Sequence, residues 1–91
     1  MLLQIFSVHD SKAGAYFQPF FQQTEGMAIR IFSDLATDPD HSFNKHPEDF
    51  TLFRLGVYND QNGEFTGEKT PHPICKAIDF AVNLNDKDVS Q

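Results

Sequence analysis

Two groups of residues in this 91-residue sequence could do chemistry, and the first lies between residues 38 and 49. His41 and His46 stand there among four carboxylates, a set of side chains that could bind a metal ion. No cysteine joins them, and a loop gives these side chains no common face. Solvation of the loop and capping of its turns explain the same residues, so we expect neither a metal ion nor another cofactor.

His72 and Cys75 form the second group, an imidazole three residues away from a thiol. A nucleophilic pair also needs an orienting third group and an oxyanion site, and no pattern in the sequence nominates either. A cysteine at the start of an apolar helix is more typical of a small buried residue. Neither GxGxxG nor GxxxxGK(S/T), the phosphate-binding patterns, occurs. We therefore expect a protein that is not an enzyme.

Aromatic residues make residues 15–23 the least ordinary segment. The chain has ten Phe, two Tyr and no Trp. Pro19 excludes a helix interior and disfavours a central strand, which predicts an extended, irregular segment. Three interpretations stay open: the rings complete the core, form an apolar patch for a partner protein or a second copy, or stack on nucleic-acid bases. The aromatic residues of the segment are Tyr16, Phe17, Phe20 and Phe21.

Composition bounds the class of protein. Seven Lys plus Arg against thirteen Asp plus Glu give a net charge of −6, and the length suffices for one domain. A chain this acidic repels nucleic acid as a whole, so any DNA contact has to be local, driven by aromatic residues or made through a partner. The single cysteine excludes a scaffold held by internal disulfides.

The sequence also argues against membrane association. The N-terminal segment has neither the basic region nor the cleavage site of a signal peptide. No window of about 18 uninterrupted apolar residues occurs, which argues against a membrane-spanning helix. We expect a protein of a reducing cytoplasm with no membrane partner.

The clearest predicted element is a helix that begins after Thr24 and ends near Thr37. Thr24 is a suitable N-cap, and Asp38-Pro39 stops the helix. Apolar residues recur at the spacing of one buried helix face. These residues are Met27, Ala28, Ile31, Phe32 and Leu35.

Hydrophobic patterning predicts strands as well, at residues 2–8 and 50–58, and then a hairpin turn and a return strand that begins at about residues 64–66, at an edge of the sheet. Alternation should place Phe53 and Val57 on one face of the second strand and Tyr58 on the other. Phe43 should anchor the polar loop 38–49 on the core.

The remaining segments complete the predicted fold. Pro71 and Pro73 bracket an irregular stretch, and residues 74–82 have helical spacing. The fold class is therefore α+β, with a small, mainly antiparallel sheet of about three strands packed with one principal helix and a short C-terminal helix. A single domain should cover residues 1–82, followed by a polar, frayed tail at 83–91.

Whole phrases of the sequence resemble a known family. They are QIFSVHDSKAGAY at residues 4–16, PFF at 19–21, FNKHPEDFTLFRLG at 43–56 and DQNG at 60–63. Nearly the first two-thirds of the chain is similar, through these phrases, to the small nonstructural proteins of gokushoviruses, which are single-stranded DNA phages of the Microviridae. The resemblance implies a phage early protein, often described as DNA-binding. It is likened to a protein that switches replication from double-stranded synthesis to single-stranded synthesis coupled to packaging.

Our leading hypothesis is a non-enzymatic phage regulatory protein of viral DNA replication, acting in the host bacterial cytoplasm. It would engage single-stranded DNA locally or act on a replication complex through a partner. The alternative is an acidic protein-interaction module, self-associating or binding a replication or host protein, with no direct DNA contact. A convergence of cations on exposed rings would favour DNA, and intervening acids would disfavour it. The expected site residues are Lys12, Tyr16, Phe17, Phe20 and Phe21, with Lys45 and Arg54 as candidate phosphate contacts.

Overall fold

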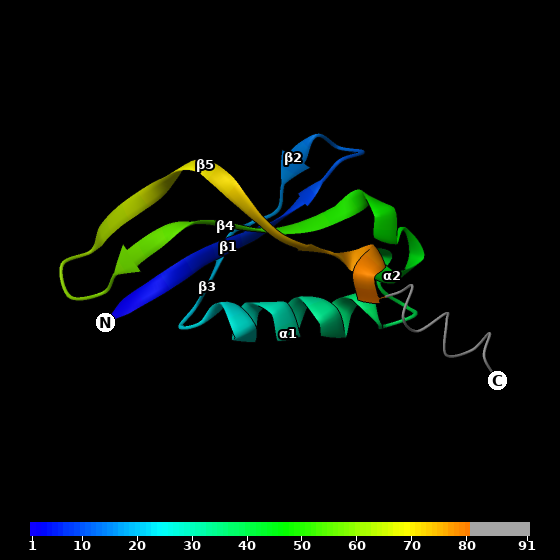
Figure 1. Cartoon of the computed structure of the whole chain (residues 1–91), viewed down its shortest axis with the longest axis horizontal. Helices are drawn as coiled ribbons and strands as arrows, with labels where there is room; N and C mark the ends of the chain where they lie inside the picture. The colour runs from blue at the N-terminus through cyan, green and yellow to red at the C-terminus, as the bar shows by residue number, and fades with distance from the viewer. Residues whose placement is uncertain (81–91) are drawn as a thin grey trace.

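The computed structural model describes residues 1–80 (Figure 1). Its first element, β1, is also a central strand of the sheet. Its strands are β1 (Leu2–Asp10), β2 (Ala15–Tyr16), β3 (Phe20–Gln22), β4 (Phe50–Asn59) and β5 (Glu64–Lys76). Its helices are α1 (Glu25–Ala36), α2 (Ser42–Lys45) and the 3-10 turn η1 (Pro47–Asp49), and residues 77–80 are helical. The predicted α+β class with a mainly antiparallel sheet is confirmed.

The sheet has five strands in the described part of the chain, where about three were predicted. The additional strands come from the aromatic segment, which pairs with β1 on the edge that β4 leaves free. Pro19 interrupts this pairing between β2 and β3, since proline has no N–H to donate. At the interruption the Phe17 N–H donates to the Val8 carbonyl over 2.8 Å, and the Ser7 hydroxyl donates to the Phe17 carbonyl over 2.6 Å.

Helix α1 lies along one face of the sheet and closes the core (Figure 1). Thr24 caps it as predicted, with the Thr24 hydroxyl accepting the Met27 N–H. The buried stripe is narrower than predicted, because Met27 and Ile31 are 51% and 39% exposed. Small residues on the buried stripe let the helix approach the sheet closely. The buried core residues are Phe6, Val8, Ala28, Phe32, Ala36, Phe43, Phe50, Leu52 and Ala77.

The predicted loop at residues 38–49 contains α2 and η1, and Phe43 anchors it as expected. Phe43 is only 2% exposed, and its ring centroid lies 5.5 Å from that of Phe32 and 4.6 Å from that of Phe50. The connection between α1 and β4 is thereby held against the core.

Strand β5 is where the sequence prediction was wrong. The strand runs to Lys76 through Pro71 and Pro73, which were predicted to bracket an irregular stretch. No described strand pairs with its outer edge, so a proline there removes no ladder hydrogen bond. Residues 74–76 consequently belong to the strand, and only 77–80 of the predicted helix 74–82 are described as helical. Residues 81 and 82 and the predicted tail 83–91 lie outside the described residues.

The pairing of β4 with β5 is irregular at Gly56. Arg54 pairs with His72 and Gly56 with Gly67, so the register shifts between these two positions. A Cβ added at Gly56 would collide with the backbone carbonyl of Thr66, which lies on β5. Glycine at this position permits the close approach of the two strands. Among the described residues, no helix is both long and apolar enough to span a membrane.

Candidate functional site

The two faces of the sheet differ in what covers them. Phe6 and Val8 of β1 and Leu52 of β4 lie on the face that packs against α1. Because side chains alternate along a strand, their neighbours in sequence point to the opposite face, which we call the open face. The strand registers place the following residues there: Leu3, Ile5, Ser7, His9, Tyr16, Phe21, Thr51, Phe53, Gly56, Tyr58, Phe65, Gly67, Pro73 and Lys76.

One aromatic group on the open face consists of His9, Tyr16 and Phe53, and we call it the first station. The ring centroids of His9 and Tyr16 are 4.7 Å apart, and those of Tyr16 and Phe53 are 5.4 Å apart. The rings meet edge to face, the geometry that aromatic quadrupoles favour. Tyr16 remains 41% exposed, so one ring of this station stays accessible.

A second aromatic group consists of Phe21, Tyr58 and Phe65, and we call it the second station. The ring centroids of Tyr58 and Phe65 lie 4.7 Å apart, and those of Phe21 and Tyr58 lie 5.6 Å apart. Phe65 is 63% exposed and Phe21 is 38% exposed. The station comes from three strands, β3, β4 and β5, and sits toward the β4–β5 hairpin end of the sheet.

The part of the open face between the stations carries smaller groups. Ile5 is 8% exposed, and Ser7, whose hydroxyl binds the Phe17 carbonyl, is fully buried. Gly56 pairs with Ile5 across the two central strands. The two stations are therefore separate groups of rings, with a stretch between them in which Ile5 and Ser7 are buried.

Charge is distributed unequally between the faces. The carboxylates within the described strands belong to Asp10, Glu64 and Glu68, and all of them lie on the α1 face by register or by contact with Arg54. Lys76 is the charged residue other than histidine that the registers place on the open face. At that end Asp79 accepts the backbone N–H of Lys76. An acidic protein thus presents aromatic rings on a sheet face whose strands contribute no carboxylate.

The four predicted aromatic site residues fall into two pairs. Tyr16 and Phe21 lie on the open face, one in each station. Phe20 lies on the α1 face, with its ring centroid 5.8 Å from that of Phe6. Phe17 is 44% exposed, but its ring centroid lies 5.7 Å from that of buried Phe43. The segment thus contributes both to the core and to an exposed surface.

Arg54 and Lys12, two of the predicted phosphate contacts, lie beside carboxylates. Arg54 Nε lies 2.9 Å from a Glu68 oxygen, and Arg54 Nη1 lies 3.2 Å from a Glu25 oxygen, both on the α1 face. Lys12 lies in the turn after β1 and lines a pocket with Glu48 and Asp49.

Lys45, the remaining predicted cation, ends α2. It belongs to the connection between α1 and β4. Lys12 and Arg54 thus have carboxylates beside them instead of converging with Lys45 on the exposed rings, which by the criterion stated above disfavours direct contact of these cations with DNA phosphates.

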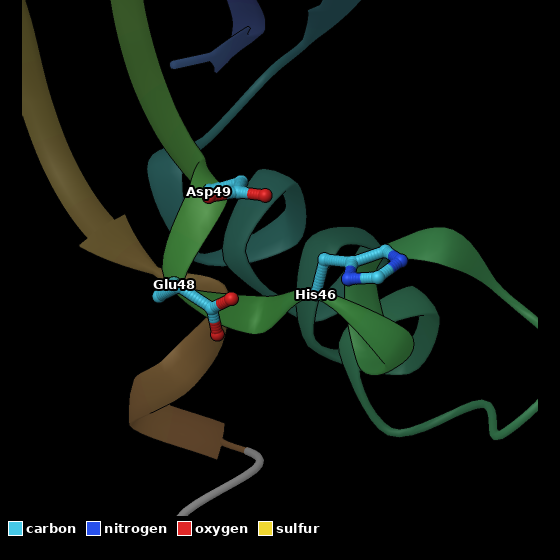
Figure 2. A group of neighbouring side chains, drawn as sticks. All are labelled: His46, Glu48 and Asp49. Carbon is cyan, nitrogen blue, oxygen red and sulfur yellow. The ribbon is translucent and has the colours of Figure 1, made fainter. Parts of the chain in front are cut away.

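His46, Glu48 and Asp49 are the described residues that best fit a metal donor set. One ligand atom from each lies within 4.8 Å of the others. Figure 2 shows the His46 imidazole extending away from both carboxylates. An imidazole and two carboxylates suit several divalent cations, but here the three groups do not point at one centre.

The capping explanation for other polar residues of this segment is confirmed. His41 Nδ1 accepts the Phe43 N–H over 3.1 Å, and Asp38 Oδ1 accepts the Asp40 N–H over 2.9 Å. These side chains stabilise the turns that lead into α2.

Cys75 lies in β5, paired with Leu52, and not at the start of a helix as predicted. Burial, helped by the negative charges of Asp79 and Glu25, raises the pKa of the Cys75 thiol from 9.0 to about 11. A thiol with so high a pKa holds little thiolate at neutral pH and is a poor nucleophile.

Sequence reasoning missed four ring residues of the open face. His9 falls just outside the predicted strand 2–8, and Phe65 lies where the predicted return strand begins. Phe53 and Tyr58 were assigned to opposite faces, because strict alternation ignores the register shift between Arg54 and Gly56. That shift puts both rings on the open face. Gly56, which stands among bulky residues, is the feature of the sequence that could have indicated such an irregularity.

Comparison with known protein families gives a match over most of the chain. Residues 3–80 match the family model described as "Phage ORF5 protein". No curated protein and no solved structure matches the chain significantly. The match covers all of the open-face residues named above.

Proposed function

The chain belongs to the Phage ORF5 protein family, and from this premise we propose that it is a non-enzymatic regulatory protein of viral DNA replication that binds single-stranded DNA through the open face. The regulated step would be replication itself or the switch to single-stranded synthesis and packaging, in the host bacterial cytoplasm. The sequence phrases that resemble gokushovirus nonstructural proteins support this setting.

The observation that carries the proposal is the open face, where exposed rings lie on a sheet face to which the strands contribute no carboxylate. Bases of a single strand are free to stack on aromatic side chains, and each stacked base contributes about 1–3 kcal/mol. The acidic residues of the strands lie on the other face, so they do not face the bound strand. Few cations are available, so stacking rather than phosphate neutralisation should supply most of the affinity.

Fluorescence anisotropy of a labelled single-stranded oligonucleotide tests this proposal, with a duplex of equal length as control. We expect binding to the single strand and little to the duplex, with a shallow dependence on salt between 50 and 200 mM. Phe65→Ala should weaken binding by at least about fivefold, the equivalent of about 1 kcal/mol. Absence of binding to either oligonucleotide at tens of micromolar protein would contradict the proposal.

Matched variants separate stacking from general apolar contact. Phe65→Leu keeps an apolar side chain but removes the ring, so it should weaken binding nearly as much as Phe65→Ala. Met27→Ala removes a side chain that is 51% exposed on α1 and should leave binding unchanged. Arg54→Gln should change the affinity less than twofold, since Arg54 is already paired with Glu25 and Glu68.

A protein-interaction module is the second candidate, and the 63% exposure of Phe65 favours it too. Exposed rings with a net charge of −6 suit a partner protein or a second copy. Under that function Phe65→Leu would be tolerated, and sedimentation would show self-association or a complex with a replication protein. DNA binding would then be absent.

A further inference from the structure

We infer that one end of the sheet is an arm that opens and closes as a single unit while the rest of the protein stays folded, and that Arg54 stabilises the closed arm. The arm consists of residues 1–5 and 56–67, and we call the remaining part of the described chain the body. Opening here means that the arm loses its strand pairing. This property does not depend on the proposed function, because it belongs to the free protein.

The strand register breaks between the arm and the body at Leu55. On the β1 side, Ile5 pairs with Gly56, and the next residue, Phe6, pairs with Arg54. Leu55 is therefore an extra residue of β4 that has no partner on β1, which is a β-bulge.

The register between β4 and β5 breaks at the same level. Gly56 pairs with Gly67 and Arg54 pairs with His72, so residues 68–71 of β5 bulge out opposite a single residue of β4. Bulges disrupt the ladder locally, and the paired glycines have no side chains to hold the two strands together. Because β4 is out of register with both of its neighbours at one level, pairing in the arm can be lost without loss of pairing in the body.

The body contains the core, and the arm does not. No residue of the arm belongs to the described core cluster or to the partly buried apolar residues that pack against it. Ile5 and Gly56 are the buried residues of the arm, and residues 60–67 are all exposed. Figure 1 shows the β4–β5 hairpin extending past the N-terminal end of α1, so the helix covers the body rather than the arm. Segments with few buried apolar contacts open at a lower free energy than the core.

Two ion pairs connect the beginning of the arm to the body on the α1 face. Arg54 Nε lies 2.9 Å from a carboxylate oxygen of Glu68, which directly follows the arm on β5, and Arg54 Nη1 lies 3.2 Å from a carboxylate oxygen of Glu25 on α1. The guanidinium thereby holds the bulge of β5 against the body beside the break in register. Loss of either charge of the pair between Arg54 and Glu68 should therefore favour opening.

Aromatic rings connect the arm to the body on the open face. The ring centroid of Phe21, which belongs to β3, lies 5.6 Å from that of Tyr58 and 6.3 Å from that of Phe65. Tyr58 and Phe65 belong to the arm, whereas all three residues of the first station belong to the body. Opening of the arm therefore takes the second station apart and leaves the first station intact.

Native-state hydrogen exchange, measured by NMR on the full-length protein, tests whether the arm opens separately. The amides of Val57 and Thr66, which pair between β4 and β5, report on the arm, and those of Leu52 and Cys75, which also pair, report on the body. We expect protection factors at least about a hundredfold lower in the arm. Exchange in the arm should also depend less on urea concentration, since opening of the arm exposes less surface than global unfolding.

Substitutions test the role of the ion pair. The pair between Arg54 and Glu68 is broken both when the arm opens and when the whole chain unfolds. Glu68→Gln and Arg54→Gln should therefore each lower protection about two- to fivefold in the arm and by the same factor in the body. Glu64→Gln is the matched control, because Glu64 lies in the same strand, makes no ion pair within residues 1–80 and should change neither. Ile29→Val, which trims a side chain packed against the core, should lower protection at least about twofold in the body and leave the arm unchanged.

Equal protection in the arm and the body would overturn the inference, because the sheet would then open only by global unfolding. An Ile29→Val variant that lowers protection equally in both parts would overturn it as well. Arm protection that Glu68→Gln and Arg54→Gln leave unchanged would refute the stabilising role of Arg54, since the ion pair would then persist in the open arm. These measurements are made without DNA, so their failure is distinct from failure of the proposed function.

Discussion

At the scale of single residues, the environment of Cys75 has a consequence that can be measured. Burial and two nearby carboxylates raise its pKa from 9.0 to about 11, which reduces the thiolate fraction near pH 8 about a hundredfold. Iodoacetamide should therefore alkylate the folded protein at least tenfold more slowly than the protein in urea. Equal rates in the two states would show that the thiol is accessible and ordinary.

The same group links stability to pH. The pKa of Cys75 is higher in the folded state than in the unfolded chain, so its contribution is fully present below pH 9 and is lost as the pH rises to about 11. Cys75→Ser, which does not titrate in this range, isolates this contribution. Between pH 8 and 10.5 the wild type should lose more stability in urea titrations than Cys75→Ser loses.

At the scale of elements, the irregular pairing of β4 with β5 depends on Gly56. Gly56→Ala should lower the free energy of unfolding by about 2–3 kcal/mol, because the new Cβ would collide with the Thr66 carbonyl. Gly26→Ala is the matched control: it sits in the first turn of α1 with open space around it, and should stabilise by up to about 1 kcal/mol. Urea unfolding followed by circular dichroism measures both, and a neutral Gly56→Ala would refute the proposed close approach.

A comparison of the individual elements shows which parts of this fold the sequence predicts. Helix α1, β1, β4 and the anchoring Phe43 follow from local patterns, because capping and apolar periodicity are written in neighbouring residues. The length of β5 does not, since Pro71 and Pro73 are compatible with a strand only at an unpaired edge, which is a property of the assembled sheet. The second station could not be predicted for the same kind of reason, because a register shift between β4 and β5 decides on which face Tyr58 lies.

At the scale of the whole molecule, the net charge of −6 acts on stability as well as on binding. Like charges repel in the compact state, and salt screens them. Raising sodium chloride from 0.05 to 0.5 M should therefore raise Tm by about 3–5 °C, as measured by circular dichroism. The double variant Glu48→Gln, Asp49→Asn carries two fewer charges and should respond less; an equal or larger response would contradict repulsion as the cause.

The central position of β1 affects how the protein can fold during its synthesis. Asp10 pairs with Phe50 and Leu2 with Asn59, so after each of these β1 residues the ribosome has to add 40 and 57 residues, respectively, before its β4 partner exists. At about 5–20 residues per second, roughly 2–11 seconds pass before β4 exists. In that interval β1 can pair only with β2 and β3, and its other edge stays open to chaperones or to neighbouring nascent chains. A message cut short before residue 50 would therefore yield a strand that never acquires its main partner.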